Sequence, residues 1–515
     1  MLVWELVGAD IFETEEYEVW LNGLFERKES RMIASLYHLK PDTDYTLTLK
    51  RKGTVFAETS FHTRREFVTL DVRSFGAKGD GQTDDTGAIQ TAILCCPPDG
   101  RVYIPEGHYR IRNLFLKSNL VLEIGKGALL EAFRERERFP VLPGVIQSYD
   151  EADEYNLGSW EGNPLDSMCS IFTGIYLENV EICGEGTIDG GGDFETWWVS
   201  GTDKNRVAPY RPRMIFLNHC SNVVIQGIRV QNSPAWNLHP YFSEKIRIYD
   251  CFIVSPAKSH NTDGIDPESC RDVEIAGVHF HVGDDCIALK SGKIYMGRKW
   301  KRPSEQIRIR QCWMEEGHGA VTIGSEIAGG VRQISVSQCR FTRTDRGLRI
   351  KTRRGRGTDS IVDEVCFDGI QMDAVKSPFV VNCFYYCDPD GRTEYVGTQE
   401  ALPVDERTPE IRSLCFRNID CRDAEYAGMS IYGLPEKKIG RIELENIQIR
   451  YAESAGEGIS AMMLACPPTS KRGIFARNVR QMVIHQVTLD GAGKDFELEE
   501  INEIITDEAV EKNID

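Results

Sequence analysis

The sequence predicts an all-β chain in which a small N-terminal β-sandwich precedes a long solenoid of stacked strands. Apolar runs of similar shape recur through most of the chain, each followed by a polar turn and a short second strand. No amphipathic helix separates them, which disfavours βαβ folds, and the four-strand blades of a β-propeller are missing. Repeats that bury their apolar faces only by stacking predict a solenoid. The runs begin near Val121, Val180, Val223, Ile246, Val273, Ile307, Ile334, Val365, Leu414, Ile442 and Val483.

The first 65 residues alternate in polarity, with turn residues between the runs, as short strands of a sandwich do. The segment 39–45, LKPDTDY, resembles the turn and tyrosine that precede a late strand of fibronectin type III domains. We therefore predict a fibronectin III-like module over residues 1–65, with a binding or spacing role rather than a catalytic one.

The solenoid is predicted over residues 66–493, and its beginning has a pattern of its own. A Gly/Asp-rich loop leads into a single helix, and a strand and turn follow at 100–109. This order resembles the opening of right-handed parallel β-helix proteins of the pectin-active kind, in which the helix closes the end of the solenoid.

Insertions between solenoid repeats lie in loops on one face. Four long ones cover 133–168, 190–213, 294–304 and 386–410, and we interpret them as walls of a cleft, with simple covering of the sheet as the alternative. Their notable residues are Trp160, Trp197, Trp198, Tyr210, Arg211 and Arg213. Residues 494–515 are acidic and are predicted to form a solvated C-terminal tail, with a frayed helix or a cap over the last coil as alternatives.

The net charge of −18 argues against nucleic acid or an anionic membrane as a partner. An acidic substrate would therefore need a locally basic site. We see no secretory signal and no apolar run long enough for a membrane span, so a cytoplasmic location is expected. The oligomeric state stays open. Seven cysteines stand singly in strand-like runs and are expected to be buried free thiols. They are Cys183, Cys251, Cys286, Cys312, Cys339, Cys366 and Cys415.

Three carboxylates are the strongest candidates for chemistry. Asp263 and Asp284 each follow a strand that begins a repeat, and Asp285 is adjacent. Because stacked strands lie about 4.7–4.9 Å apart, carboxylates at equivalent points of neighbouring coils would interact. Their repulsion raises at least one pKa, which leaves one acid to protonate a leaving oxygen and one base to activate water. The alternative is a solvated pair of surface aspartates.

His318 stands between Gly317 and Gly319, one repeat beyond the carboxylates. Glycine neighbours let the backbone approach a ligand and expose the ring. We predict that His318 hydrogen-bonds an acidic partner and controls its protonation state, with a purely structural histidine as the alternative.

The segment 343–356 is the basic patch that an acidic substrate would require, with seven cations against Asp345. Arg349 and Lys351 flank Ile350 on a strand, so both point to one face while Ile350 enters the core. An arginine fork and a lysine charge suit carboxylate binding. A solvated basic face is expected for Arg353, Arg354 and Arg356.

Four motifs then resemble one known family. Asn-Thr-Asp at 261–263, Gly-Asp-Asp at 283–285, Gly-His-Gly at 317–319 and Arg-Ile-Lys at 349–351 resemble, in this order, the polygalacturonases of glycoside hydrolase family 28. The likeness covers roughly residues 67–490. It implies a right-handed parallel β-helix that hydrolyses α-1,4-galacturonosidic bonds of galacturonan, an acidic oligosaccharide or polysaccharide, with inversion and without a cofactor or metal.

By the same resemblance Asp284 would be the general acid, Asp263 and Asp285 would activate water, and His318 would support the acid. Substrate binding would fall to Arg349 and Lys351, together with the motif residues Asn261 and Gly317. A tyrosine usually completes the family's site, and Tyr385 and Tyr386 both remain candidates.

The long loops and the N-terminal module resemble the exo-acting bacterial branch, in which loops that close a cleft admit only chain ends. Three alternatives remain: another pectic glycosidase such as a rhamnogalacturonan hydrolase, a non-catalytic carbohydrate-binding β-helix, and a calcium-dependent pectate lyase. Calcium binding by the aspartates alone also remains, whereas zinc-type Cys/His spacing does not occur.

Overall fold

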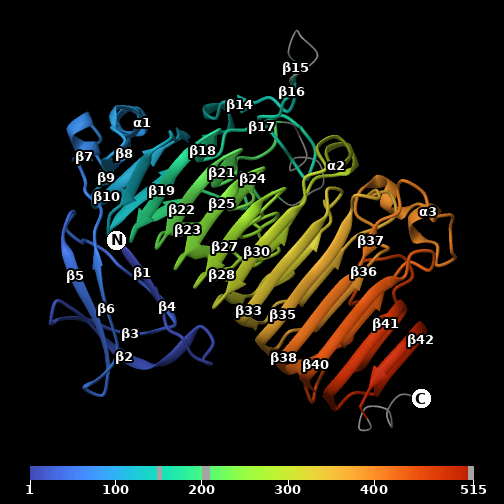
Figure 1. The fold of residues 1–515 in the computed structure, drawn as a ribbon. Coiled ribbons are helices and arrows are strands. Elements are labelled where there is room, and N and C mark those ends of the chain that lie inside the picture. The colour runs from blue at the N-terminus through green and yellow to red at the C-terminus, as the bar shows by residue number, and fades with distance from the viewer. Residues whose placement is uncertain (148–153, 200–208, 508–515) are drawn as a thin grey trace.

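The computed structural model describes residues 1–147, 154–199 and 209–507, and it confirms a parallel β-helix preceded by small N-terminal sheets (Figure 1). Strands β1 (Leu2–Glu5) and β4 (Ile33–Leu36) form an antiparallel pair. An antiparallel sheet of order β3-β2-β5-β6 contains β2 (Glu13–Leu21), β3 (Leu24–Arg31), β5 (Asp44–Arg51) and β6 (Thr54–His62).

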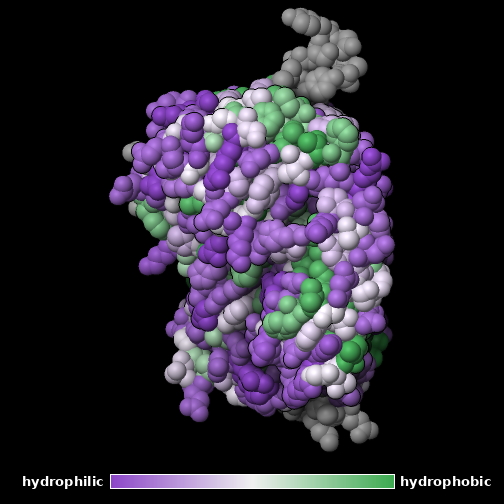
Figure 2. Space-filling model, turned by 90° about the vertical axis from the view of Figure 1, so that its left-hand side faces the viewer, coloured by the Kyte–Doolittle hydropathy of each residue, from purple (hydrophilic) through white to green (hydrophobic). Residues whose placement is uncertain are grey.

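The N-terminal sheets are joined to the flank of the β-helix by polar contacts. Arg31 forms an ion pair with Asp250, and Glu5 pairs with Arg310 at 2.8 Å. Within the module, the hydroxyl of Tyr45 accepts a hydrogen bond from the backbone of Lys40 at 2.9 Å, which ties the predicted turn to its strand. The side of the molecule that faces left in Figure 1 is largely hydrophilic, with a few small hydrophobic patches (Figure 2).

Each coil of the β-helix contributes strands to up to three parallel stacks. The first stack contains β7 (Val68–Asp71), β9 (Gly100–Ile104), β12 (Leu120–Ile124), β19 (Glu178–Gly184), β22 (Ser221–Gln226), β25 (Glu244–Tyr249), β27 (Arg271–Ala276), β30 (Ser304–Arg310), β33 (Val331–Thr342), β35 (Ile361–Asp373), β38 (Ser413–Ala424), β40 (Ile439–Tyr451), β41 (Arg472–Asp490) and β42 (Lys494–Thr506).

The second stack contains β8 (Asp80–Asp84), β10 (Gly107–Ile111), β13 (Ala128–Ala132), β20 (Thr187–Asp189), β23 (Arg229–Gln231), β26 (Phe252–Val254), β28 (His279–His281) and β31 (Trp313–Glu315). The third contains β11 (Leu114–Phe115), β18 (Phe172–Ile175), β21 (Ile215–Asn218), β24 (Leu238–Tyr241), β29 (Ile287–Leu289), β32 (Val321–Gly324), β34 (Arg346–Lys351), β36 (Ser377–Asn382) and β39 (Ala427–Tyr432).

The remaining elements lie at the end of the helix or in insertions. Helix α1 (Thr86–Cys95) packs near the first coils, and α2 (Ile294–Trp300) and α3 (Glu394–Gly397) lie in the inserted loops (Figure 1). Short strands of the insertions are β14 (Val141–Leu142), β15 (Ile146–Gln147), β16 (Glu154–Tyr155), β17 (Ser167–Met168) and β37 (Glu410–Ile411). The 3₁₀ turns are η1 (Val72–Phe75), η2 (Arg136–Arg138) and η4 (Pro389–Arg392).

The core is a column of aliphatic side chains stacked in register. Strands β19, β22, β25, β27 and β30 pair in parallel, and each places one isoleucine above the next. These fully buried residues are Ile182, Ile225, Ile248, Ile275 and Ile309. Alternation along each strand therefore sends every second side chain inward and leaves its neighbours facing loops or solvent.

Two sequence predictions about surface and core are wrong in part. Residues 494–506 are not a tail, because they form β42, which pairs with β41 along its length. The rest of the predicted tail, 508–515, lies outside the described residues. All sixteen cysteines are free, but Cys366 and Cys415 are only half-buried, since they alternate with core residues and face away from the core. No helix in the described ranges is long and apolar enough to cross a membrane.

A chain that ends at Asp490 should be less stable and should self-associate, because the full edge of β41 would lose its partner. Thermal unfolding and size-exclusion chromatography would measure both effects. A chain that ends at residue 507 keeps β42 and is the matched control. Equal melting temperatures for the two chains would contradict a structural role for β42.

Candidate active site

The third stack positions the predicted catalytic carboxylates. Ile265 pairs in parallel with Ile287 of β29, so Asp263 and Asp285, each two residues earlier, occupy equivalent points of adjacent coils. The backbone N–H of Gly264 donates to the carbonyl of Asp285 at 3.0 Å and fixes this register. The sequence predicts Asp263 and Asp284 at equivalent points of adjacent coils. In the structure the residue equivalent to Asp263 is Asp285, and Asp284 is its neighbour in the chain.

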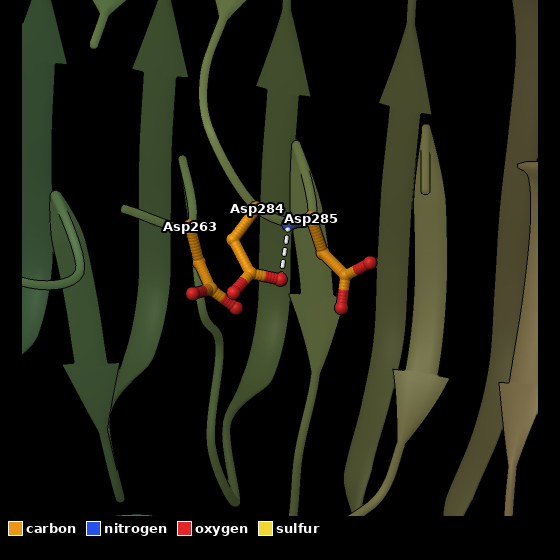
Figure 3. Close-up of side chains that lie close together, drawn as sticks. All are labelled: Asp263, Asp284 and Asp285. Carbon is orange, nitrogen blue, oxygen red and sulfur yellow. Dashed lines mark hydrogen bonds between the residues drawn. The ribbon is translucent and has the colours of Figure 1, made fainter. Parts of the chain in front are cut away.

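The structure brings the three carboxylates together. One carboxylate oxygen of each lies within 4.8 Å of those of the other two. Their side chains extend to the same side of the chain from neighbouring segments, and Asp285 donates a backbone hydrogen bond to Asp284 Oδ1 at 3.0 Å (Figure 3). Asp263 and Asp285 are buried, whereas Asp284 is partly exposed. A group of this kind serves acid–base chemistry and could also hold a cation such as calcium.

His318 contacts only one of the three aspartates, with Nδ1 3.4 Å from Asp284 Oδ1 and half of its side chain exposed. Steric clashes explain why glycine stands on both sides of His318. A Cβ on Gly317 would lie 2.6 Å from the carbonyl of Asp284, and one on Gly319 would lie 2.8 Å from Asp285 Oδ1. The close approach that the Gly-His-Gly motif predicted is therefore present, and it brings the imidazole to the carboxylates.

Arg349 and Lys351 approach the cluster from β34, two coils beyond β29. Lys351 Nζ lies 2.8 Å from Asp285 Oδ2, and Arg349 Nη1 lies 3.4 Å from Asp285 Oδ1. Between them Ile350 is fully buried in the core. The alternation along one strand thus places both cations on the face that carries the aspartates.

The structure distinguishes the two candidate tyrosines. The ring of Tyr385 lies 5.7 Å from Lys351 Nζ and 6.0 Å from Arg349 Cζ, within range of a cation–π interaction with both. Tyr386 instead lies under the guanidinium of Arg392, at 5.1 Å in the inserted loop. Tyr385 is therefore the tyrosine of this site.

In the described part of the chain, no hydrogen bond or ion pair links the side chain of Asn261 to the three carboxylates. Its Oδ1 accepts a hydrogen bond from Arg211 Nη2 at 2.7 Å, and Arg211 also donates to the carbonyl of His260 at 3.1 Å. Asn261 therefore connects the catalytic segment to the wall formed by the insertion 190–213.

The electrostatic environment separates the pKa values of the three aspartates. Burial, reinforced by Asp266 and Asp284, raises the pKa of Asp263 well above its usual value. Burial acts in the same direction on Asp285, but Lys351 and Arg349 outweigh it and hold the pKa of Asp285 low. Burial also acts to raise the pKa of Asp284, but the interactions with His318 and Lys351 together outweigh it and lower that pKa. Of the three aspartates, Asp263 is therefore the one with the raised pKa, which differs from the predicted role of Asp284 as the acid.

Three charged residues of the site were missed by the sequence analysis: Asp266, Lys290 and Glu326. All three are buried beside the aspartates, with Lys290 Nζ 3.5 Å from Asp266 and 3.3 Å from Glu326. The period-two argument applied to Arg349 and Lys351 would also have placed Lys290 on the face of the site. Glu326 leaves no such signal, because only the pairing of coils brings it close.

The predicted solvated face at Arg353, Arg354 and Arg356 is wrong, because all three are buried. The loop after β36 covers them and supplies carboxylates: Asp390 pairs with Arg353 at 2.8 Å. Glu436 pairs with Arg354 at 2.6 Å. These arginines anchor a wall of the site and are not free to bind an acidic polymer.

A first wall stands on the coil that precedes Asp263. Trp160, from the insertion 133–168, stacks on Tyr210 at 4.8 Å and on Trp236 at 5.9 Å. The backbone of Asn237, next to Trp236, donates to the carbonyl of Asp263 at 2.8 Å, which places this aromatic stack directly beside the catalytic segment. Parts of both insertions, residues 148–153 and 200–208, lie outside the described residues.

A second wall stands beyond the cations. Residues 459–462 accept hydrogen bonds from Arg346, whose Nε and Nη2 donate to Ser460 and Ile459. The sulfur of Met462 lies 2.8 Å from Arg349 Nη2, and its carbonyl accepts from Asn382 at 3.1 Å. Described residues thus lie beside the carboxylates on the preceding coil and beside the cations on the following coils.

Clustered carboxylates with a supporting histidine and cations, on a parallel β-helix, define a polysaccharide-active acid–base enzyme. The family model "Glycosyl hydrolases family 28" matches residues 153–461, and "Rhamnogalacturonase A/epimerase, pectate lyase-like" matches 69–148. The chain belongs to glycosyl hydrolase family 28 and is a glycoside hydrolase.

Individual relatives agree with this assignment. A probable polygalacturonase of Vitis vinifera is 30% identical over 388 residues, which cover 74% of each chain. The exopolygalacturonase of Yersinia enterocolitica has the same fold, with a TM-score of 0.70 at 18% identity over 96% of this chain and 95% of that one. That of Thermotoga maritima has a TM-score of 0.59 at 26% identity, over 85% and 91%. Both endo- and exo-acting names occur among the matched relatives.

Replacing Tyr385 with alanine should weaken substrate binding, because its ring supports both Arg349 and Lys351. A loss of about 1 kcal/mol, roughly fivefold in KM, follows from the usual strength of such contacts. Steady-state kinetics would measure it. Tyr386→Ala is the matched control, and an equal or larger effect there would reverse the assignment of the two tyrosines.

Proposed function

We propose that this glycoside hydrolase cleaves α-1,4-galacturonosidic bonds of galacturonan and acts from chain ends. The single observation that supports an acidic substrate is the placement of Arg349 and Lys351 on the same face as the carboxylates, in a chain of net charge −18. A guanidinium and an ammonium side by side suit a uronate carboxylate. The similarity to a probable polygalacturonase and to an exopolygalacturonase supports the same substrate.

In the proposed reaction Asp284, which is partly exposed and whose Oδ1 lies 3.4 Å from His318 Nδ1, donates a proton to the glycosidic oxygen. The bond between that oxygen and the anomeric carbon breaks. Asp263, assisted by Asp285, takes a proton from water, whose oxygen bonds to the anomeric carbon. The products are a new hydroxyl on the leaving chain and a free anomeric hydroxyl. The proton on Asp263 then leaves to solvent, and the half-exposed His318 passes a solvent proton to Asp284 for the next cycle.

In the proposed mechanism, substrate binding changes which aspartate carries the proton. A uronate carboxylate between Arg349 and Lys351 would neutralise part of the positive charge that lowers the pKa values of Asp284 and Asp285. Less positive charge raises those pKa values, so the shared proton shifts from Asp263 to Asp284. The acid and the base are then in the states that hydrolysis requires.

The family resemblance implies inversion of configuration at the anomeric carbon. The separation of the carboxylates also bears on the stereochemistry. One oxygen of each carboxylate lies within 4.8 Å of one oxygen of each of the other two. Inverting pairs usually stand about 6.5–9.5 Å apart, and retaining pairs about 5–5.5 Å. We propose inversion, with proton NMR of the first anomer released as its test. A first product with the α configuration of the substrate would contradict it.

The acid assignment predicts the effect of one substitution. Asp284→Asn should lower kcat by about 100- to 10,000-fold, the usual contribution of a general acid, and leave the melting temperature near that of the wild type. Release of reducing ends from oligogalacturonate would measure it. Glu178→Gln, at the exposed edge of β19, is the matched control.

Wild-type protein that releases nothing from uronate polymers or oligomers would refute the function, and unsaturated products lost on chelation would favour a lyase.

The two walls support exo-action. The aromatic stack at Trp160 and the contacts of Met462 leave a bounded site between the coil of β24 and the coil of β36. A long polymer needs a groove that is open in both directions, whereas a bounded site fits a chain end.

Exo-action predicts that reducing ends accumulate from polygalacturonate while viscosity falls slowly. Viscometry and a reducing-end assay on the same digest would measure this, with product sizes from chromatography. A steep early fall in viscosity would identify internal cleavage instead.

A further inference from the structure

Lys290 occupies a position in the site that mirrors that of Lys351. It directly follows β29 and pairs in register with Glu268 of the previous coil. The next coil places Gly324 at this point, and the coil after that places Lys351 there. Two lysines therefore project from equivalent register positions, Lys290 on the coil of Asp285 and Lys351 two coils beyond it.

Each lysine serves a different aspartate. Lys351 lies 2.8 Å from Asp285, whereas Lys290 Nζ lies 3.9 Å from Asp263 Oδ2. Among the described residues Lys290 is the cation within 4.0 Å of Asp263. Lys290 is only 4% exposed and its ammonium lies 4.5 Å from the centroid of the Trp236 ring, so it does not face bound substrate directly.

The carboxylates around Lys290 depend on its charge. Asp263 Oδ1 and both oxygens of Asp266 are buried without a hydrogen-bond partner in the described part of the chain. Glu326 shares the ammonium at 3.3 Å, the shortest of these separations. One positive charge is thus divided among three acids, and only one of them is a proposed catalytic group.

We propose that Lys290 is a positioning residue that, in the substrate complex, favours the ionised carboxylate of Asp263 and orients it, with Oδ2 toward the ammonium and Oδ1 free for the attacking water. Glu326 limits this effect, because it draws the same ammonium away from Asp263. The inference rests on the proposed function, in which Asp263 is the base.

The titration of Asp263 depends on all charged groups that face it or Lys290. Among the described residues these groups include Glu161, Arg211, Asp266, Glu268, Asp284, Asp285, Glu326 and Lys351, and the uncharged imidazole of His239 also faces Lys290. A change at Lys290 or Glu326 leaves the others in place, so a pair of opposite substitutions isolates the shared ammonium.

Removing the charge with Lys290→Met raises the pKa of Asp263 in the substrate complex. The base then ionises only at higher pH, so the acidic limb of the kcat–pH profile moves upward by about one unit, the lower range for a lost ion pair. KM changes little, because Lys290 does not touch substrate. Lys290→Arg keeps the charge and the position of the limb, which a purely structural role would not predict.

Glu326→Gln should have the opposite effect, because it frees the ammonium for Asp263 and removes a repelling charge. The acidic limb then moves to lower pH. This variant also tests the inference if Lys290→Met does not fold, which thermal unfolding would report. Lys376→Met, whose partner is Asp345 at 2.7 Å outside the cluster, is the matched control with an unmoved limb.

The full-length chain and oligogalacturonate at saturating concentration suffice for all of these profiles. Limbs that do not move in Lys290→Met and Glu326→Gln, or that move in the same direction, overturn the role of Lys290 while leaving the hydrolase function intact. A wild-type chain without hydrolytic activity overturns the proposed function and, with it, this inference.

Discussion

In-register stacking of parallel coils is the constraint on which the rest of the structure depends. Successive coils repeat at about 4.8 Å, and the buried isoleucine column prevents slippage, since a shift by one residue would turn core side chains outward. The same register that aligns Ile265 with Ile287 sets Asp263 beside Asp285. Core packing and the geometry of the site are therefore two consequences of one backbone pattern.

Bringing several carboxylates together out of water is costly, and the protein offsets that cost with cations from neighbouring coils. Lys351 and Arg349 stabilise the negative charge of Asp285, and Lys290 lies between Asp263 and Glu326. Buried ion pairs of this kind add little net stability, but removal of one partner leaves a charge uncompensated. The positions of the cations therefore determine which carboxylate has the highest pKa. In the proposed reaction a bound uronate changes this balance, because it neutralises part of the positive charge.

Loops between the strands of the β-helix pack beside the site. They use ordinary contacts: an aromatic stack at Trp160, buried arginines paired with Asp390 and Glu436, and the backbone around Met462. Arg353 and Arg354, which the sequence predicted to be solvated, instead form ion pairs that hold these loops. Of the basic segment, Arg349 and Lys351 are the cations that lie beside the carboxylates, and both pair with Asp285.

The sequence by itself determined the features that depend on local periodicity. Strand alternation placed Ile350 in the core and its two neighbours on one face, the glycines around His318 indicated close approach, and the regular repeat predicted stacking. Only the tertiary structure decided which residues meet across coils: that Asp285 is the equivalent of Asp263, that Tyr385 rather than Tyr386 joins the cations, and that residues 494–506 form a strand. The physical reason is that alternation acts within one strand, whereas register and loop closure are settled by contacts between segments far apart in the chain.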